Sequence, residues 1–115
     1  SAGHAGAILC SPHHLSVWLA RTDLPLGFDP DSTFTTLQHQ VRSGDRLYLT
    51  SDGIYETLSP EQELWGKERL QEVLERHATR SVDYVMDQCV QVSRAWQQAE
   101  HFPDDAALVC LERTA

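Results

Sequence analysis

The first half of the chain consists of short apolar segments separated by turn residues. An apolar run over residues 5–11 and a loosely alternating segment over residues 14–20 predict two strands. Residues 34–41 also alternate, and they predict a further, half-exposed strand. A Ser-Gly-Asp turn then precedes residues 46–51, where the leucines share one face, so this segment predicts another strand.

The second half predicts two helices and a closing strand. Apolar residues recur at helical spacing over residues 67–78 and 82–96. Ser81 is typical of an N-cap, and Pro103 prevents the second helix from continuing. Residues 106–112 are apolar on both faces, which predicts a central strand that is covered on both sides. About five strands, with two helices before the last one, predict an α+β fold with an antiparallel sheet.

Composition limits the classes of partner. The chain has 115 residues and 41% hydrophobic content, which suit one domain with a modest core. Nine Lys and Arg face seventeen Asp and Glu, giving a net charge of -8, so we expect no nucleic-acid partner. No segment approaches the roughly 20 apolar residues of a membrane span, so we expect no membrane partner.

The cysteines indicate the compartment. Cys10, Cys89 and Cys110 are odd in number and lack paired spacing, which disfavours a disulfide framework or a zinc site. Each lies among apolar neighbours, which predicts buried, reduced thiols. We therefore expect a reducing, cytoplasmic environment.

Two acidic sites are candidates for chemistry. Asp52-Gly53 closes one predicted strand and Asp104-Asp105 opens another. If these strands are antiparallel neighbours, the carboxylates converge, and a bound divalent cation such as Mg²⁺ or Mn²⁺ would relieve their repulsion. The alternative is structural, because Asp-Gly is common in hairpin turns and Asp-Asp after proline is common in solvated loops. Residues 54–60 do not resemble a returning strand, which weakens the hairpin interpretation.

Five motifs follow one another along nearly the whole chain. They are Ser1-Ala2-Gly3-His4, Leu24-Pro25-Leu26-Gly27, the block from Gly44 to Glu56 that contains Thr50-Ser51-Asp52-Gly53, Leu64-Trp65-Gly66, and Asp104-Asp105-Ala106-Ala107-Leu108-Val109. In this order they resemble the C-terminal half of SpoIIE-like serine/threonine phosphatases. These are the bacterial branch of the metal-dependent (PPM, type 2C) protein phosphatases.

The resemblance implies a fold and a reaction. The fold is an antiparallel β-sandwich flanked by helices, incomplete in this chain. The reaction is hydrolysis of phosphoserine or phosphothreonine, in which two Mn²⁺ or Mg²⁺ ions activate a bridging water. Asp52 and Asp104 match catalytic metal ligands, and Gly53 matches a position where the backbone approaches the site closely. Asp105 matches either a further ligand or a residue that supports the ligands.

Two other positions match residues near the metals. The resemblance implies that His4 and Glu56 support the ligands without binding metal themselves. For His4 the alternative is a side chain that stabilises a turn, and for Glu56 it is a purely structural role.

The chain departs from the family pattern at several positions. Ser1 replaces asparagine, Trp65 replaces phenylalanine, and Ala106-Ala107 removes a hydroxyl beside the acidic pair. The N-terminal half of the domain, with the aspartate that bridges both metals, has no counterpart. The chain starts at Ser1 and its only methionine is Met86, so we expect residues 1–115 to be the C-terminal part of a single domain in a longer protein.

Three functions remain open at this point. The first is a bacterial signalling phosphatase that acts on a phosphorylated regulatory protein such as an anti-sigma-factor antagonist, downstream of a sensor or receiver domain. The second is an inactive phosphatase-fold module that binds a regulatory partner. The third is an α+β interaction domain whose motifs arose by chance, which a large separation of Asp52 from Asp104 would favour.

Overall fold

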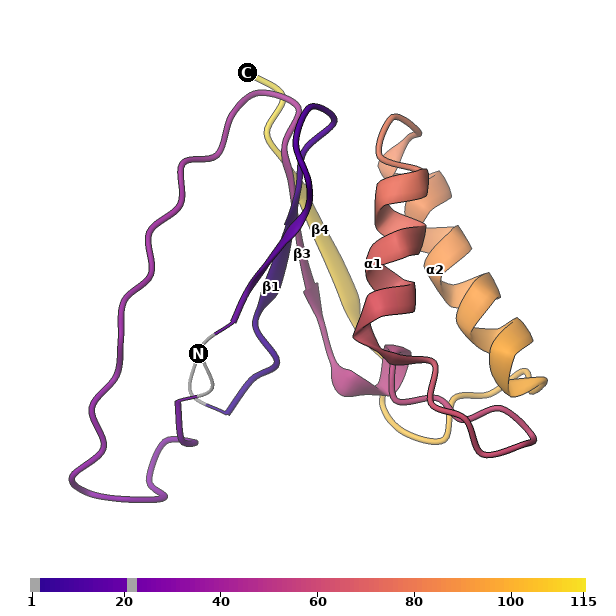
Figure 1. Cartoon of the computed structure of the whole chain (residues 1–115), viewed down its shortest axis with the longest axis horizontal. Coiled ribbons are helices and arrows are strands. Elements are labelled where there is room, and N and C mark those ends of the chain that lie inside the picture. Colours follow the sequence, from indigo (N-terminus) through magenta and orange to yellow (C-terminus); the bar gives the residue numbers. More distant parts are fainter. Residues whose placement is uncertain (1–2, 21–22) are drawn as a thin grey trace.

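A computed structural model describes residues 3–20 and 23–115 of the chain. Helices α1 (Gly66–Arg76) and α2 (Val82–Gln97) lie on one face of a four-stranded antiparallel sheet (Figure 1). The strands, in the spatial order β2-β1-β3-β4, are β1 (Ala7–Cys10), β2 (Val17–Leu19), β3 (Arg46–Thr50) and β4 (Leu108–Glu112). The predicted α+β class is confirmed.

The core lies between the sheet and the helices. Ile8 of β1 pairs with Tyr48 of β3, which pairs in turn with Cys110 of β4, and Ile8 and Tyr48 are fully buried. Burial of such apolar area is the main stabilising contribution to folding, so this layer holds the helices on the sheet. The helices contribute Leu70, Val73 and Leu74 from α1 and Val85 and Cys89 from α2.

The three cysteines belong to this layer. Cys10 and Cys89 are buried, Cys110 is half-buried, and all three are free thiols. Burial raises the pKa of Cys10 and of Cys89 to about 12, so both stay protonated at neutral pH. The predicted burial is confirmed for Cys10 and Cys89.

The other side of the sheet is also apolar, and it is partly exposed. We call this side the outer face. Leu49, Val109 and Leu111 on it are 38%, 50% and 58% exposed. Cross-strand register arranges its central residues in two rows, Leu9–Leu47–Leu111 and Ala7–Leu49–Val109.

Two predictions about strands are wrong. Strand β4 is an edge strand with one exposed face, although its apolar residues on both faces suggested a central, covered strand. Residues 34–41 do not form a strand. This segment runs exposed and apart from the sheet (Figure 1), and within the described residues it pairs with none of the four strands.

The helix boundaries follow local signals. The Ser81 hydroxyl accepts a hydrogen bond from the backbone N–H of Tyr84 (3.3 Å), which confirms the predicted N-cap. Helix α2 ends at Gln97, and Gln98 adopts a left-handed conformation (φ 54°), so the helix stops before Pro103. Neither helix described here is long and apolar enough to cross a membrane.

We expect the 115-residue chain to self-associate through the outer face, because contiguous exposed apolar surface favours association. Leu111→Lys should lower the extent of association measured by sedimentation over a range of protein concentrations. The matched control is Leu15→Lys, because Leu15 is 90% exposed but lies in the β1–β2 turn and not on the sheet. Equal association of the two variants would contradict the prediction.

Candidate functional site

The two acidic segments meet at one end of the sheet. Strands β3 and β4 are antiparallel and Thr50 pairs with Leu108, so the end of one lies beside the start of the other. Ser51 joins the two segments. Its N–H donates to the Ala107 carbonyl (2.9 Å), and its hydroxyl donates to the Asp105 carbonyl (3.0 Å) and accepts from the Ala107 N–H (2.8 Å). The condition set in the sequence analysis, that these two strands are antiparallel neighbours, is met.

Gly53 makes the approach of the segments possible. A Cβ at this position would lie 2.2 Å from the Asp105 carbonyl oxygen and 2.8 Å from its carbonyl carbon. No side chain fits there unless the backbones separate. The short 3₁₀ helix η1 (Asp52–Ile54) therefore rests directly on the backbone of the second acidic segment.

A buried polar contact ties η1 to helix α2. The Ser93 hydroxyl, which is fully buried, donates to the Ile54 carbonyl (2.8 Å). It also lies 3.2 Å from the hydroxyl of Thr57, which is fully buried too. Buried hydrogen bonds of this kind are costly to break, so α2 fixes the turn that carries Asp52.

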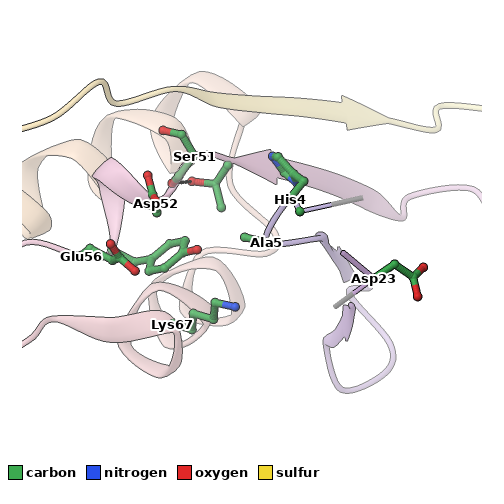
Figure 2. Close-up of a pocket in the computed structure, with 10 residues that line it drawn as sticks. His4, Ala5, Asp23, Ser51, Asp52, Glu56 and Lys67 are labelled. Carbon is green, nitrogen blue, oxygen red and sulfur yellow. Dashed lines mark hydrogen bonds between the residues drawn. The ribbon is translucent and has the colours of Figure 1, made fainter. Parts of the chain in front are cut away.

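Asp52 borders a cavity of about 400 Å³. Glu56 and Lys67 line it from the same side as Asp52, and His4 lies across from them (Figure 2). Tyr55 lines the cavity as well. His4 and Glu56 thus line the same cavity as Asp52, as the resemblance led us to expect. The remaining lining residues are Gly3, Ala5, Asp23, Thr50 and Ser51.

The predicted supporting residues differ in their local contacts. His4 Nδ1 accepts a hydrogen bond from the Gly6 N–H (3.1 Å), which is the turn-stabilising contact given above as the alternative. The N–H of Glu56 donates to the Asp52 carbonyl (2.8 Å), so Glu56 follows Asp52 in the same tight turn. Ser1 and Ala2, which open the first motif, lie outside the described residues.

Asp104 and Asp105 are near the cavity in the fold but do not line it. Both are exposed, and Asp104 Oδ1 accepts a hydrogen bond from the Asp105 N–H (2.7 Å). The Asp105 backbone, and not its carboxylate, makes the contacts with Ser51 and Gly53.

The site fits a hard divalent cation in the chemistry of its donors but not in their number. Carboxylate oxygens are the ligands that Mg²⁺ and Mn²⁺ prefer. Among residues 3–20 and 23–115, however, no three His, Cys, Asp or Glu side chains converge in a group that could hold a metal. Asp52 and the neighbouring acidic pair therefore offer suitable donor atoms, but the described residues form no complete metal site.

The cavity also contains a cation that sequence reasoning missed. Lys67 Nζ lies 4.9 Å from the ring centroid of Trp18 and 5.5 Å from that of Tyr55. These two rings meet edge to face at 6.2 Å. Burial, together with the carboxylates of Asp52 and Glu56, raises the pKa of Tyr55, so its hydroxyl stays neutral at physiological pH.

A known family matches almost the whole chain. A family model described as Stage II sporulation protein E (SpoIIE) matches residues 1–114. Protein IcfG of Synechocystis sp. is 31% identical over 74 residues, which are 64% of this chain and 12% of IcfG.

Solved structures share the fold. The SiaA-PP2C domain of Pseudomonas aeruginosa matches with a TM-score of 0.80 at 18% identity, over 96% of this chain and 44% of that one. The RsbU and RsbW domains of Rv1364c from Mycobacterium tuberculosis match with a TM-score of 0.69 at 17% identity, over 98% of this chain and 31% of that one. The chain thus spans less than half of each of these proteins.

We expect Gly53→Ala to destabilise the chain by about 3 kcal/mol or more, because the new methyl group would overlap backbone that cannot rotate away. The control is Gly27→Ala. Gly27 has φ +81° but no atom within 4 Å of an added Cβ, so its variant should lose only the roughly 1–2 kcal/mol of left-handed strain. Urea denaturation measures both. A Gly53→Ala cost no larger than that of Gly27→Ala would contradict the close approach.

Ser93→Ala should cost about 1–3 kcal/mol of unfolding free energy, because it leaves the Ile54 carbonyl and the Thr57 hydroxyl buried without a partner. Adding Thr57→Val removes one of these unpaired groups, so the double variant should recover part of the loss. Ser43→Ala, at an exposed serine, should stay within about 0.5 kcal/mol. Strictly additive losses in the double-mutant cycle would show that the two hydroxyls do not interact.

Proposed function

The chain belongs to the SpoIIE family, and we propose that it is the C-terminal part of a metal-dependent phosphatase domain. Its substrate would be phosphoserine or phosphothreonine on a bacterial regulatory protein. The observation that carries this proposal is the meeting of the Asp52-Gly53 turn with the Asp104-Asp105 segment, at the sheet end that borders the cavity. The PP2C fold of the SiaA domain supports it.

Two features support the view that residues 1–115 are only part of the domain. The chain covers 44% of the SiaA-PP2C structure. Its outer face presents two rows of apolar residues, and a second sheet packed on this face would bury them. Such a layer would complete the β-sandwich that the resemblance implies.

In the complete domain, Asp52 and Asp104 would be metal ligands, and Asp105 a further ligand or a supporting residue. Bound Mn²⁺ or Mg²⁺ would supply an activated water and neutralise charge on the phosphoryl group. The chain itself contributes rigidity. Ser51 joins the two acidic segments, and Gly53 lets them touch, so the Asp52 backbone is held without help from a metal.

The partner class follows from the family. We propose that the substrate is a phosphorylated Ser/Thr regulatory protein in the cytoplasm, such as an anti-sigma-factor antagonist, and that a sensor or receiver domain precedes the phosphatase in the parent protein. Support comes from the relatives, because IcfG is far longer than the matched segment and the RsbU domain of Rv1364c is found with an RsbW domain.

One observation favours a second candidate, a phosphatase-fold module that binds its partner without turnover. The described residues hold no group of three metal-ligating side chains. Ala107 also stands where the family carries a hydroxyl. Calorimetric titration of the complete protein with Mn²⁺ distinguishes the candidates, since tight binding of about two ions would exclude a metal-free module.

Asp52→Asn in the complete protein should reduce Mn²⁺-dependent dephosphorylation of a phosphoserine substrate to background, because it removes a charged ligand. Asp31→Asn is the matched control, as Asp31 is an exposed turn residue away from the cavity. It should leave the rate unchanged. Full activity of Asp52→Asn would refute the proposed role of this site.

A further inference from the structure

Lys67 is the cation of the cavity that Asp52 borders. It is the only Lys or Arg among the described residues that line this cavity, which otherwise carries the carboxylates of Asp23, Asp52 and Glu56. Within the described part of the chain, the ion pair found joins Arg46 to Glu112 (3.0 Å), and Lys67 takes part in none. Its charge is therefore not neutralised by a neighbouring carboxylate.

The ammonium group is held in place without using its hydrogen-bond donors. Trp18 and Tyr55 attract it through their ring faces. A ring face takes no directed hydrogen bond of the kind an oxygen accepts, so the three N–H donors of Lys67 remain available for a ligand. Neither ring carries a charge that a ligand would have to displace.

The backbone fixes Lys67 relative to Asp52. Helix α1 begins at Gly66, whose N–H donates to the Tyr55 carbonyl (2.8 Å). The buried Trp65 donates its N–H to the Thr57 carbonyl (2.9 Å). The start of α1 is thus hydrogen-bonded to the segment that follows Asp52, and both lie on the same side of the cavity (Figure 2).

An anion with several acceptor oxygens fits this arrangement. A phosphate monoester carries about -1.5 to -2 charges at neutral pH and three acceptor oxygens. Carboxylates on the cavity wall repel such a group, so a fixed cation on the same wall favours its entry. Lysine suits this task because its ammonium is a compact charge with three donors.

We propose that Lys67 binds the phosphoryl group of the substrate, donating to a non-bridging oxygen from its position over Trp18 and Tyr55. This inference rests on the proposed phosphatase function and adds the residue that recognises the phosphate. Lys67 positions the substrate and exchanges no proton with it. A purely structural lysine would pack over the same rings but would not affect phosphate binding.

The test measures the affinity of the complete protein for inorganic phosphate by calorimetry, in the same Mn²⁺ buffer for every variant. Lys67→Met keeps an apolar stem over the rings and removes the charge. It should weaken phosphate binding at least about tenfold, which equals about 1.4 kcal/mol. Lys67→Arg should bind phosphate more tightly than Lys67→Met. Thermal unfolding of each variant checks that the fold is retained.

The matched control is Arg76→Gln, which removes one positive charge from the same helix at the end away from the cavity. It should bind phosphate as tightly as the unaltered protein. Equal affinity of Lys67→Met and the unaltered protein, or no phosphate binding by the unaltered protein, would overturn the inference. Equal weakening by Lys67→Met and Arg76→Gln would overturn it too, because the effect would then be one of net charge.

Measurements of kcat and KM distinguish a failure of this inference from a failure of the proposed function. With a phosphoserine peptide, Lys67→Met should raise KM by the same factor as the loss of phosphate affinity and change kcat by less than about twofold. Loss of activity in Asp52→Asn, with unchanged KM and phosphate affinity in Lys67→Met, would refute only the role of Lys67. Full activity in Asp52→Asn would refute the phosphatase site, while the phosphate titration would still decide whether Lys67 binds the anion.

Discussion

The close contact between Gly53 and the Asp105 backbone is the constraint on which the candidate site depends. The antiparallel pairing of β3 and β4 brings two strand ends together, but pairing alone would leave room for a side chain between the turns. The missing Cβ at Gly53 lets one turn rest on the other, and Ser51 joins them with three hydrogen bonds. Two acidic segments that are distant in sequence thereby share one rigid backbone unit.

This unit is anchored to the helical layer by polar contacts as well as by the apolar core. Ser93 of α2 holds the Ile54 carbonyl, and Gly66 at the start of α1 donates to the Tyr55 carbonyl. Both helices are therefore hydrogen-bonded to the segment that carries Asp52. A displacement of either helix would shift the wall of the cavity, since Lys67 and Glu56 lie on these same segments. Packing of the helices and geometry of the site are consequently coupled.

Local signals allowed much of the fold to be predicted from the sequence. Helical periodicity and the Ser81 cap placed α2, and the Ser-Gly-Asp turn placed β3, because these features depend on neighbours in the chain. Residues 34–41 showed alternation without a partner strand, and pairing is a non-local property. The place of Lys67 in the cavity was not predicted for the same reason. Its ammonium group lies over two aromatic rings, one in β2 and one directly after η1, which are distant from each other in the sequence.

The outer face and the turn that carries Asp52 lie close together in the structure. The row Ala7–Leu49–Val109 lies one residue along the strands from the Thr50–Leu108 pair. Strand β3 ends at Thr50, and the turn that carries Asp52 begins two residues later. A layer packed on this face would therefore reach the end of the sheet at which Asp52 lies. Burial of the apolar rows would hold that layer in register, and its residues at this end would stand beside Asp52. On the proposed phosphatase function, one packing event would bury these apolar rows and bring further side chains beside Asp52.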